Sequence, residues 1–380
     1  MTDFNLPADG VFIGRIWSPE AQGPSVVTIR DGSVVDITSK DAPTVRDICE
    51  MENPADYVCN APATAVGRLA DIARNSGQMD KPHFLAPCDL QAVKACGVTF
   101  ASSMVERVIE EQAAGDPKKA LDIRARVGEA IGGSLRNIKA GSTEAANVKA
   151  ALIAEGLWSQ YLEVGIGPDA EVFTKAPVLS SVGPGAEVGL HPISKWNNPE
   201  PEIVLAVSSK GRIVGASLGN DVNLRDVEGR SALLLGKAKD NNASCSIGPM
   251  IRLFDDGFTL DDVRQAELDL TVTGEDGYEL KGHSSMKEIS RDPADLVAQT
   301  LGRHHQYPDG IVLFLGTLFA PTKDRDKLGE GFTHKIGDIV TISSLRLGSL
   351  TNTVRLSTEC REWTFGVASF MRNLAARNLI

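Results

Sequence analysis

Short apolar runs separated by Gly and Pro dominate the hydrophobic pattern of this chain. Residues 11–16, 25–29 and 33–37 have the length and β-branched content of strands, and helical spacing follows at residues 63–75. We therefore expect residues 1–80 to form a small N-terminal domain of mixed α and β structure. Its residues show no catalytic pattern, so its expected role is packing or support of a dimer.

Residues 81–380 predict one larger domain. A buried strand is expected at residues 93–100, followed by a lid and helical insertion at about residues 100–160. Beyond residue 170, apolar runs punctuated by Gly indicate a mostly β body, and residues 365–380 have the spacing of an amphipathic helix. The whole pattern predicts an α+β protein.

Composition narrows the function classes. The 380 residues are 42% hydrophobic and 23% charged, and the net charge of −11 argues against binding to nucleic acid or to an anionic membrane. No apolar run approaches the ~18 residues of a membrane span, and the N-terminus lacks the pattern of a signal peptide. The six cysteines include no Cys-x-x-Cys pair, which favours reduced thiols. We expect a cytoplasmic protein.

Carboxylates at the start of a predicted hairpin provide the strongest chemical signal. Glu200 and Glu202 stand two residues apart before the apolar run 203–207, so their side chains share one face of a strand. After a turn, the run 213–218 leads back to Asp221, which antiparallel pairing places roughly opposite Glu200. Three converging carboxylates predict an all-oxygen site for Mg²⁺, with Mn²⁺ or Ca²⁺ as substitutes.

A bare Glu-x-Glu is more often a solvated surface pair, but the flanking motifs favour the metal site. Their identity and order resemble the fumarylacetoacetate hydrolase superfamily from about residue 85 to residue 354. The resemblance implies a C-terminal mixed β-sheet roll of that type. The motifs are Phe173-Thr-Lys175, Ser181-Val-Gly-Pro-Gly185, Gly219-Asn-Asp-Val-Asn-Leu-Arg-Asp226, Ala238-Lys239, Ile247-Gly-Pro249, Gly316-Thr317 and Gly337-Asp338.

The resemblance implies enolate chemistry on a 2-oxo acid. The metal would hold the carboxylate and keto oxygens and stabilise an enolate formed at C3. Lys239 matches the active-site lysine of the family and is the expected base, with a pKa lowered by the metal and by partial burial. Lys237 is the alternative if the alignment is shifted by two residues.

The lid motif indicates the reaction type. Family members that hydrolyse carbon–carbon bonds carry Tyr-x-x-His-x-x-Glu, whereas this chain has Phe100-Ala-Ser-Ser103-Met-Val-Glu106. Without the histidine, no nearby residue can activate water, so the motif suits a branch that dehydrates 2-keto-3-deoxy sugar acids. Glu106 is the expected acid for loss of the C4 hydroxyl. Ser103 and Glu106 also spell a capping box, which would begin a helix at Ser103.

Several further residues are implied near the substrate. Ser103 is a candidate contact as well as a candidate catalytic residue, and Gly97 is a candidate lid hinge. Arg225 and Asp226 match an Arg-Asp pair of the family, in which Arg225 either positions a carboxylate or supports the metal ligands. The alternative is that the two residues form a purely structural pair. The predicted substrate-binding set is Phe100, Ser102, Lys175, Arg225, Asp226 and Thr317.

The sequence therefore predicts a Mg²⁺-dependent dehydratase that converts a 2-keto-3-deoxypentonate to 2-oxoglutarate semialdehyde, also called 2,5-dioxopentanoate. The resemblance implies a homodimer or homotetramer. One alternative is a diketo-acid hydrolase or an oxaloacetate decarboxylase on the same fold. A second alternative is a protein that binds metal or sugar acid without catalysis.

Overall fold

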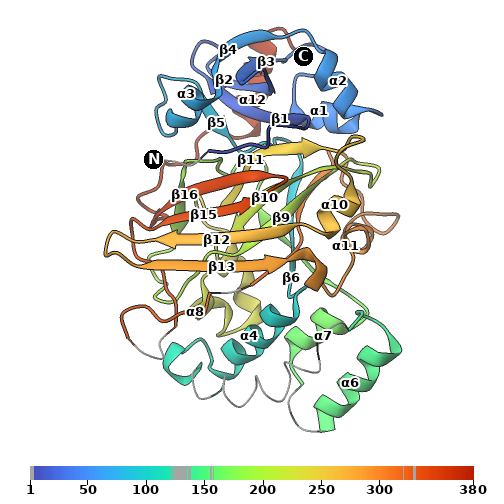
Figure 1. The fold of residues 1–380 in the computed structure, drawn as a ribbon, viewed down its shortest axis with the longest axis vertical. Helices are drawn as coiled ribbons and strands as arrows, with labels where there is room; N and C mark the ends of the chain where they lie inside the picture. The colour runs from blue at the N-terminus through green and yellow to red at the C-terminus, as the bar shows by residue number, and fades with distance from the viewer. Residues whose placement is uncertain are drawn as a thin grey trace.

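Two β-sheets with helices at both ends make up the fold (Figure 1). The predicted α+β class is confirmed. A computed structural model of the chain describes residues 4–120, 123, 135, 138–154, 156, 158–319, 321–327 and 331–380.

The larger sheet runs from the N-terminal region into the middle of the molecule. Its neighbours are mostly antiparallel, with one parallel pair between β14 and β6. In spatial order its strands are β4 (Thr64–Arg68), β3 (Ser33–Asp36), β2 (Gly23–Arg30), β1 (Phe12–Ser18), β11 (Cys245–Leu253), β10 (Ile213–Asp221), β9 (Pro201–Val207), β14 (Ile311–Phe314), β6 (Ala92–Gly97) and β7 (Glu171–Ala176), while β5 (His83–Leu85) pairs with β1.

The smaller sheet packs across the larger one. Its strands are, in spatial order, β13 (Glu279–Ser285), β12 (Glu267–Thr273), β15 (Ile339–Ser344), β16 (Gly348–Leu356) and β8 (Glu187–Leu190). Leu205 and Leu218 of the larger sheet share one buried cluster with Leu270 and Ile342 of the smaller sheet. Burial of these side chains removes apolar surface from water and joins the two sheets.

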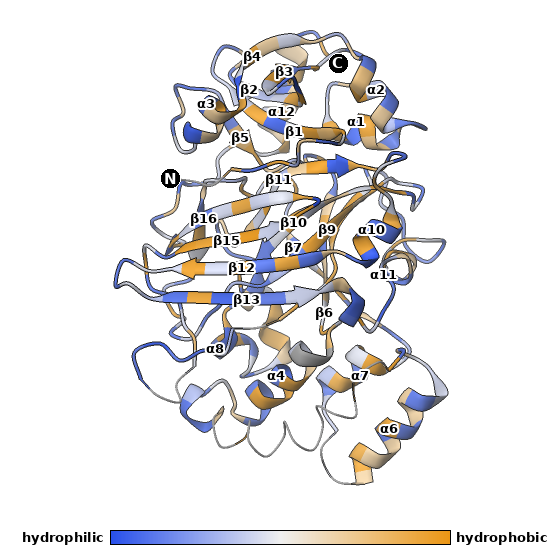
Figure 2. Cartoon of the chain, in the orientation of Figure 1, coloured by the Kyte–Doolittle hydropathy of each residue, from blue (hydrophilic) through white to orange (hydrophobic). Residues whose placement is uncertain are grey.

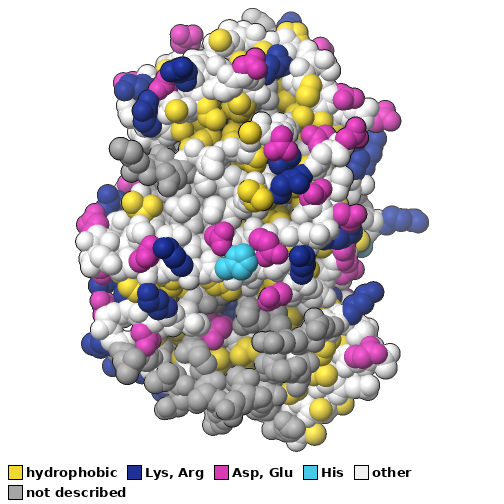
Figure 3. Space-filling view, in the orientation of Figure 1, with side chains coloured by type: hydrophobic (Ala, Val, Ile, Leu, Met, Phe, Trp, Pro, Cys, Tyr) yellow, Lys and Arg dark blue, Asp and Glu magenta, His cyan; other side chains and the backbone are white. Residues whose placement is uncertain are grey.

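Strand β12 shows that the smaller sheet has one buried face and one solvent-exposed face. Its residues alternate between buried and less buried positions, which is the period of a strand with one face in the core (Figure 2). The outward face carries charged side chains of both signs, which are visible in the space-filling view (Figure 3). This face is therefore an ordinary solvated surface.

Most helices gather at the two ends of the sheets, while α10 and α11 lie beside them (Figure 1). Helix α4 is amphipathic in sequence, and its Met104, Val108 and Ile109 pack with Leu162 of α7. The helices are α1 (Val45–Glu50), α2 (Pro54–Asn60), α3 (Leu69–Arg74), α4 (Ala101–Gln112), α6 (Thr143–Ala154), α7 (Gln160–Ile166), α8 (Arg225–Glu228), α9 (Leu235–Lys239), α10 (Leu260–Arg264), α11 (Pro293–Thr300) and α12 (Val367–Ala376), with 3-10 turns η1 (Ala232–Leu234) and η2 (Met286–Glu288).

The N-terminal strands and the C-terminal helix are confirmed, but the expected helix at residues 63–75 is only half correct. Its first half forms β4, because the chain there pairs with the exposed edge of β3. Helix α12 returns to the N-terminal region, where Asn373 donates to the carbonyl of Ala21 at 2.7 Å. Strand β1 also pairs with β11, which connects the N-terminal strands to the larger sheet. The domain boundary at residue 80 stays a prediction.

Part of the expected lid and insertion lies outside the described residues. Helix α4 ends at Gln112, and most positions between 121 and 137 are not described. Within the described ranges, no helix is both long and apolar enough to cross a membrane.

Candidate metal and active site

The hairpin of β9 and β10 has the predicted register. Glu202 pairs with Gly219, and Pro201 pairs with Asn220. One step further, the backbone N–H of Asp221 donates to the carbonyl of Glu200 at 3.1 Å. Asp221 therefore returns opposite Glu200, as the sequence predicted.

The three carboxylates converge. Each of Glu200, Glu202 and Asp221 offers an oxygen within 4.8 Å of the others, and all three side chains are buried. Burial, followed by the charges of Asp221 and Glu200, raises the pKa of Glu202 well above its ordinary value. Its carboxyl also accepts the backbone N–H of Gly316 at 2.7 Å. Crowding of this kind favours binding of a cation.

Two buried lysines contact the triad. Lys239, at the end of α9, lies 3.0 Å from Asp221 Oδ2 and also contacts Glu200 Oε2. Lys175 of β7 lies 2.7 Å from Asp221 Oδ1 and donates to the carbonyl of Lys239. The structure thus brings Lys239 to the triad, whereas Lys237 is exposed and lies 3.3 Å from a ring nitrogen of His191.

The pKa of Lys239 differs from the expectation of a lowered value. Burial alone lowers it, but the charges of Asp221 and Glu200 outweigh burial and raise the pKa above its ordinary value. These contacts hold the ammonium in its charged form. The expectation of a lowered pKa concerned a lysine beside a bound metal ion, so it stays a prediction for the metal-bound site.

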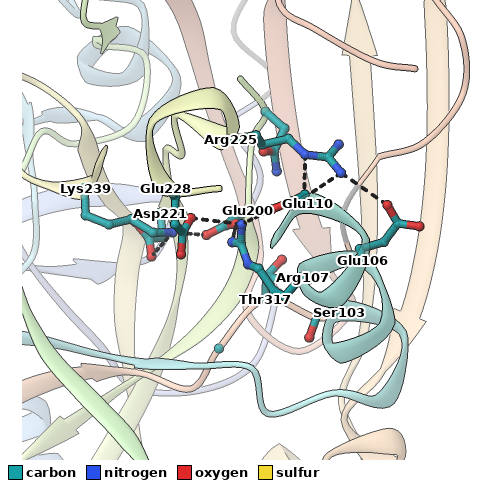
Figure 4. A network of polar contacts seen from close by, with 12 residues as sticks. Ser103, Glu106, Arg107, Glu110, Glu200, Asp221, Arg225, Glu228, Lys239 and Thr317 are labelled. Carbon is teal, nitrogen blue, oxygen red and sulfur yellow. Dashed lines mark hydrogen bonds and ion pairs between the residues drawn. The ribbon is translucent and has the colours of Figure 1, made fainter. Parts of the chain in front are cut away.

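Arg107 of helix α4 joins the same cluster and was not predicted. Its guanidinium contacts Glu200 Oε1, and it lies 2.6 Å from Glu110 and 2.9 Å from Glu228 (Figure 4). In the sequence, Arg107 and Glu110 have the i, i+3 spacing of a common surface ion pair on a helix. Nothing in that spacing distinguishes a pair that faces a buried carboxylate.

Arg225 forms a second attachment for helix α4. Its Nε donates to Glu110 at 2.7 Å and its Nη2 lies 3.2 Å from Glu106 (Figure 4). Its guanidinium also stacks on the ring of Trp196 at 4.4 Å, and it donates to the carbonyl of Pro321 at 3.1 Å. Arg225 is buried, so these contacts replace its hydration. It supports the lid in this structure, and its predicted contact with substrate stays a prediction.

The connected charges do not balance. In the described part of the chain, this network holds four cationic side chains and six carboxylates. When all six carboxylates are ionised, the difference is two charges, which one divalent cation would balance. The hard oxygen donors of the triad suit Mg²⁺. The cations are Arg107, Lys175, Arg225 and Lys239, and the carboxylates are Glu106, Glu110, Glu200, Glu202, Asp221 and Glu228.

The capping-box alternative for the lid is wrong. Helix α4 begins at Ala101 with Phe100 as its N-cap, so Ser103 lies inside the first turn. The Ser103 hydroxyl donates to the carbonyl of Phe100 at 2.8 Å, and the Glu106 carboxylate faces Arg225. The helix starts two residues earlier than expected, which frees Glu106 from a capping role.

The remaining predicted contacts are placed around this centre. Phe100 is fully buried in the main core, and Thr317 is buried with its hydroxyl donating to the carbonyl of Phe319 at 3.0 Å. Asp226 accepts from Ser194 Oγ at 2.7 Å, which supports the structural reading of that residue. The side chain of Ser102 lies outside the described residues. The substrate-binding roles of this set stay predictions.

Glu171 is a further buried carboxylic acid near the site, and the sequence did not predict it. Burial, followed by the negative charge of Glu228, raises its pKa from 4.5 to about 7. Strand alternation gives Glu171 the same face of β7 as Phe173. Phe173 in turn lies 5.9 Å below the Lys239 ammonium. The signal was available, because Glu171 stands two residues before a motif already assigned to the site.

The segment between β6 and α4 carries backbone strain. Val98 has a φ of +56°, a left-handed conformation that is rare for a β-branched residue. At the preceding position, a side chain on Gly97 would collide with the Glu171 carboxylate. Strain at this junction supports the predicted hinge of the lid.

The chain is similar to known proteins over most of its length. Residues 146–355 match the family described as fumarylacetoacetate (FAA) hydrolase C-terminal. A probable 2-keto-3-deoxyxylonate dehydratase of Haloferax volcanii is 27% identical over 332 residues, covering 86% of this chain and 93% of that protein. A 2-dehydro-3-deoxy-D-arabinonate dehydratase of Saccharolobus solfataricus is 30% identical over 188 residues, 49% of this chain and 58% of that protein.

Solved structures share the fold. The apo form of a 2-keto-3-deoxy-D-arabinonate dehydratase superposes with a TM-score of 0.63 at 18% identity, covering 92% of this chain and 99% of that one. A 2-keto-3-deoxy-D-arabinonate dehydratase complexed with magnesium and 2,5-dioxopentanoate gives 0.61 at 20% identity, with coverage of 90% and 98%. The predicted resemblance is confirmed.

The raised pKa of Glu171 predicts a pH-dependent stability. The pKa is 4.5 for an ordinary Glu and about 7 here, so between these values the folded protein binds more protons than the unfolded chain. The free energy of unfolding therefore falls as pH rises through this window. Glu171→Gln removes that loss, and we expect it to gain roughly 2–3 kcal/mol over the wild type near pH 8 and nothing near pH 4.

Urea unfolding between pH 4 and pH 8 measures this difference. The control is Glu279→Gln, which changes an exposed carboxylate on β13. Stability curves of Glu171→Gln and wild type that run parallel across the whole pH range would contradict the prediction.

Proposed function

Because this chain belongs to the fumarylacetoacetate hydrolase family, we propose that it is a metal-dependent dehydratase that converts a 2-keto-3-deoxypentonate to 2,5-dioxopentanoate. The observation that carries this proposal is the buried triad next to Lys239, under a lid that has Ser103 where hydrolases of the family have histidine. The names of both relatives support the same substrate class.

Glu200, Glu202 and Asp221 would hold the metal. When bound, Mg²⁺ would act as a Lewis acid that stabilises negative charge on the oxygens of a 2-oxo acid. Their burial keeps bulk water away from the carboxylates, which strengthens every charge interaction in the site. Mn²⁺ or Ca²⁺ would serve the same oxygen donors less specifically.

Lys239 is the proposed base for the C3 proton. Its ammonium contacts Glu200 and Asp221, which are two of the three ligand residues. The same two carboxylates cause its raised pKa, so neutralising them removes that cause and leaves burial to lower the pKa. Lys175 fixes the turn that carries Lys239 by donating to its backbone carbonyl.

Glu106 is the proposed acid for departure of the C4 hydroxyl. In the reaction the C3–H bond breaks with the proton passing to Lys239, and the C4–O bond breaks with a proton passing from Glu106 to give water. The elimination leaves a C3=C4 enone with a hydroxyl on C5. Transfer of one proton from C5 to C3 gives the C4=C5 enol, and tautomerisation of this enol to the aldehyde yields 2,5-dioxopentanoate. Arg225 holds Glu106 near the site in this structure. The Ser103 hydroxyl donates to the carbonyl of Phe100, and among the described residues it has no partner that would make it a base for water.

Compartment and assembly remain proposals. We propose that the enzyme is cytoplasmic, as its composition indicates. We also propose that it forms a homodimer or homotetramer, as the family resemblance implies. Light scattering coupled to size-exclusion chromatography would decide the oligomeric state.

Glu202→Gln tests the metal site without disturbing its ion pairs. Glu202 has a raised pKa and bonds a backbone N–H, so the neutral amide fits its surroundings. We expect Mg²⁺ affinity to fall at least about tenfold and dehydration to be lost, while stability in chelator equals or exceeds that of the wild type. Titration calorimetry measures the affinity, a product assay the dehydration and thermal unfolding the stability, with exposed Glu267→Gln as control. Unchanged Mg²⁺ affinity would contradict this assignment.

Lys239→Met and Lys237→Met form a matched pair. Lys239→Met removes the proposed proton acceptor, so kcat should fall by at least about 10²-fold. Lys237→Met changes an exposed residue and should keep nearly full activity. Steady-state kinetics with a 2-keto-3-deoxypentonate and Mg²⁺ gives both values. If Lys237→Met is the inactive variant, the assigned base is wrong.

Glu106→Gln separates the two proton transfers. It keeps a polar partner for Arg225 but cannot deliver a proton to the leaving hydroxyl. We expect dehydration to be lost while the substrate still exchanges its C3 protons in deuterated water, as followed by NMR. Glu111→Gln, on the same helix and bonded to Ser159, is the control. Full dehydration by Glu106→Gln would show that this residue is only structural.

A further inference from the structure

The ladder between β9 and β10 continues beyond the triad. Asn198 forms an antiparallel bridge with Asn223, and each backbone N–H donates to the other's carbonyl at 3.1 Å. Every second pair of an antiparallel ladder projects to the same face. The pairs that share the triad's face are therefore Glu202 with Gly219, Glu200 with Asp221, and Asn198 with Asn223. Beyond the ladder, the guanidinium of Arg225 stacks on the ring of Trp196.

The two asparagines lie between the triad and Arg225. Their pair is two residues along the strands from Glu200 and Asp221, a separation of roughly 7 Å. Helix α4 spans the same interval, since Arg107 contacts Glu200 at one end and Glu106 and Glu110 contact Arg225 at the other (Figure 4). The pair is thus placed beneath the lid, next to the carboxylates.

Their side chains have hydrogen-bonding groups without partners. Both residues are fully buried. Among the described residues, the Asn223 amide has no partner for either its oxygen or its nitrogen, and Asn198 Oδ1 has none. Only Asn198 Nδ2 is used, in a bond to the carbonyl of Pro199 at 2.8 Å. Buried amides are normally satisfied, because an unmet group costs free energy.

We propose that Asn198 and Asn223 form a subsite that binds the hydroxyl groups of the substrate. An amide offers both a donor and an acceptor, which a hydroxyl group matches with its own acceptor and donor. A 2-oxo sugar acid held at the triad by its oxo-acid end extends its hydroxyl-bearing carbons along the hairpin, toward this pair or away from it. The unmet amides select the direction toward the pair. This inference rests on the proposed function and adds the residues that select a hydroxylated acid.

The test compares two ligands that differ in hydroxyl groups. A 2-keto-3-deoxypentonate carries them, and 2-oxobutyrate has the same oxo-acid end without them. Asn223→Ala and the nearly isosteric Asn223→Leu both remove the amide, and Asn198→Ala removes the second one. The control is Asn352→Ala, a buried asparagine whose amide already donates to Gly183 at 3.1 Å and Ala186 at 3.0 Å.

We expect each subsite variant to lower kcat/KM for the hydroxylated acid at least about tenfold, the effect of one lost hydrogen bond in a buried site. The inhibition constant of 2-oxobutyrate and the Mg²⁺ affinity should stay within about twofold of wild type. Asn352→Ala should change stability alone. A purely structural role would affect both ligands alike, so the effect on the hydroxylated acid relative to the effect on 2-oxobutyrate identifies a subsite.

Two results would overturn the inference. Equal losses for both ligands would show that the asparagines support the triad, and a lower melting temperature with an unchanged ratio would show that they hold buried water. If the wild type binds Mg²⁺ and 2-oxobutyrate but dehydrates no 2-keto-3-deoxy acid, the proposed function has failed instead. In that case, calorimetry measures the affinity of each variant for the two acids. The subsite is supported if the variants lose affinity for the hydroxylated acid but not for 2-oxobutyrate.

Discussion

Repulsion among three buried carboxylates is the constraint on which the rest of this structure depends. Glu200, Glu202 and Asp221 are held close together by the register of one hairpin, where water cannot screen them. Three cationic side chains contact the triad and reduce this repulsion: Lys175, Lys239 and Arg107. Burial, followed by the charges of Asp221 and Glu200, still raises the pKa of Glu202 in the presence of these cations. A divalent cation completes the balance.

The same charges connect the metal site to the lid. Arg107 belongs to helix α4 yet contacts a triad carboxylate, and Arg225 follows β10 yet holds Glu106 and Glu110 of that helix. Buried ion pairs of this kind are costly to break one partner at a time. They fix helix α4 against the hairpin, and the strained Val98 lies where the chain leads into this helix. Position and chemistry of the site therefore come from one network.

The sequence predicted the parts that follow from local periodicity. The hairpin, its register and the triad depend on strand alternation over about twenty residues, and they are confirmed. The predicted start of α4 at Ser103 was wrong, because Ser103 and Glu106 have the spacing of a capping box although the helix begins at Ala101. Arg107 and the raised pKa of Lys239 depend on contacts between segments far apart in the chain, which no local pattern contains. Glu171 could have been found by extending the alternation of β7 by one step.

Proton release on magnesium binding tests the central claim most directly. Calorimetric titration near pH 7 in buffers of different ionisation enthalpy gives both the number of ions bound and the number of protons exchanged. The account predicts one Mg²⁺ per chain with release of up to one proton, because Glu202 has a raised pKa and must ionise to serve as a ligand. No binding, or binding without proton release, would contradict a crowded triad that is completed by a cation.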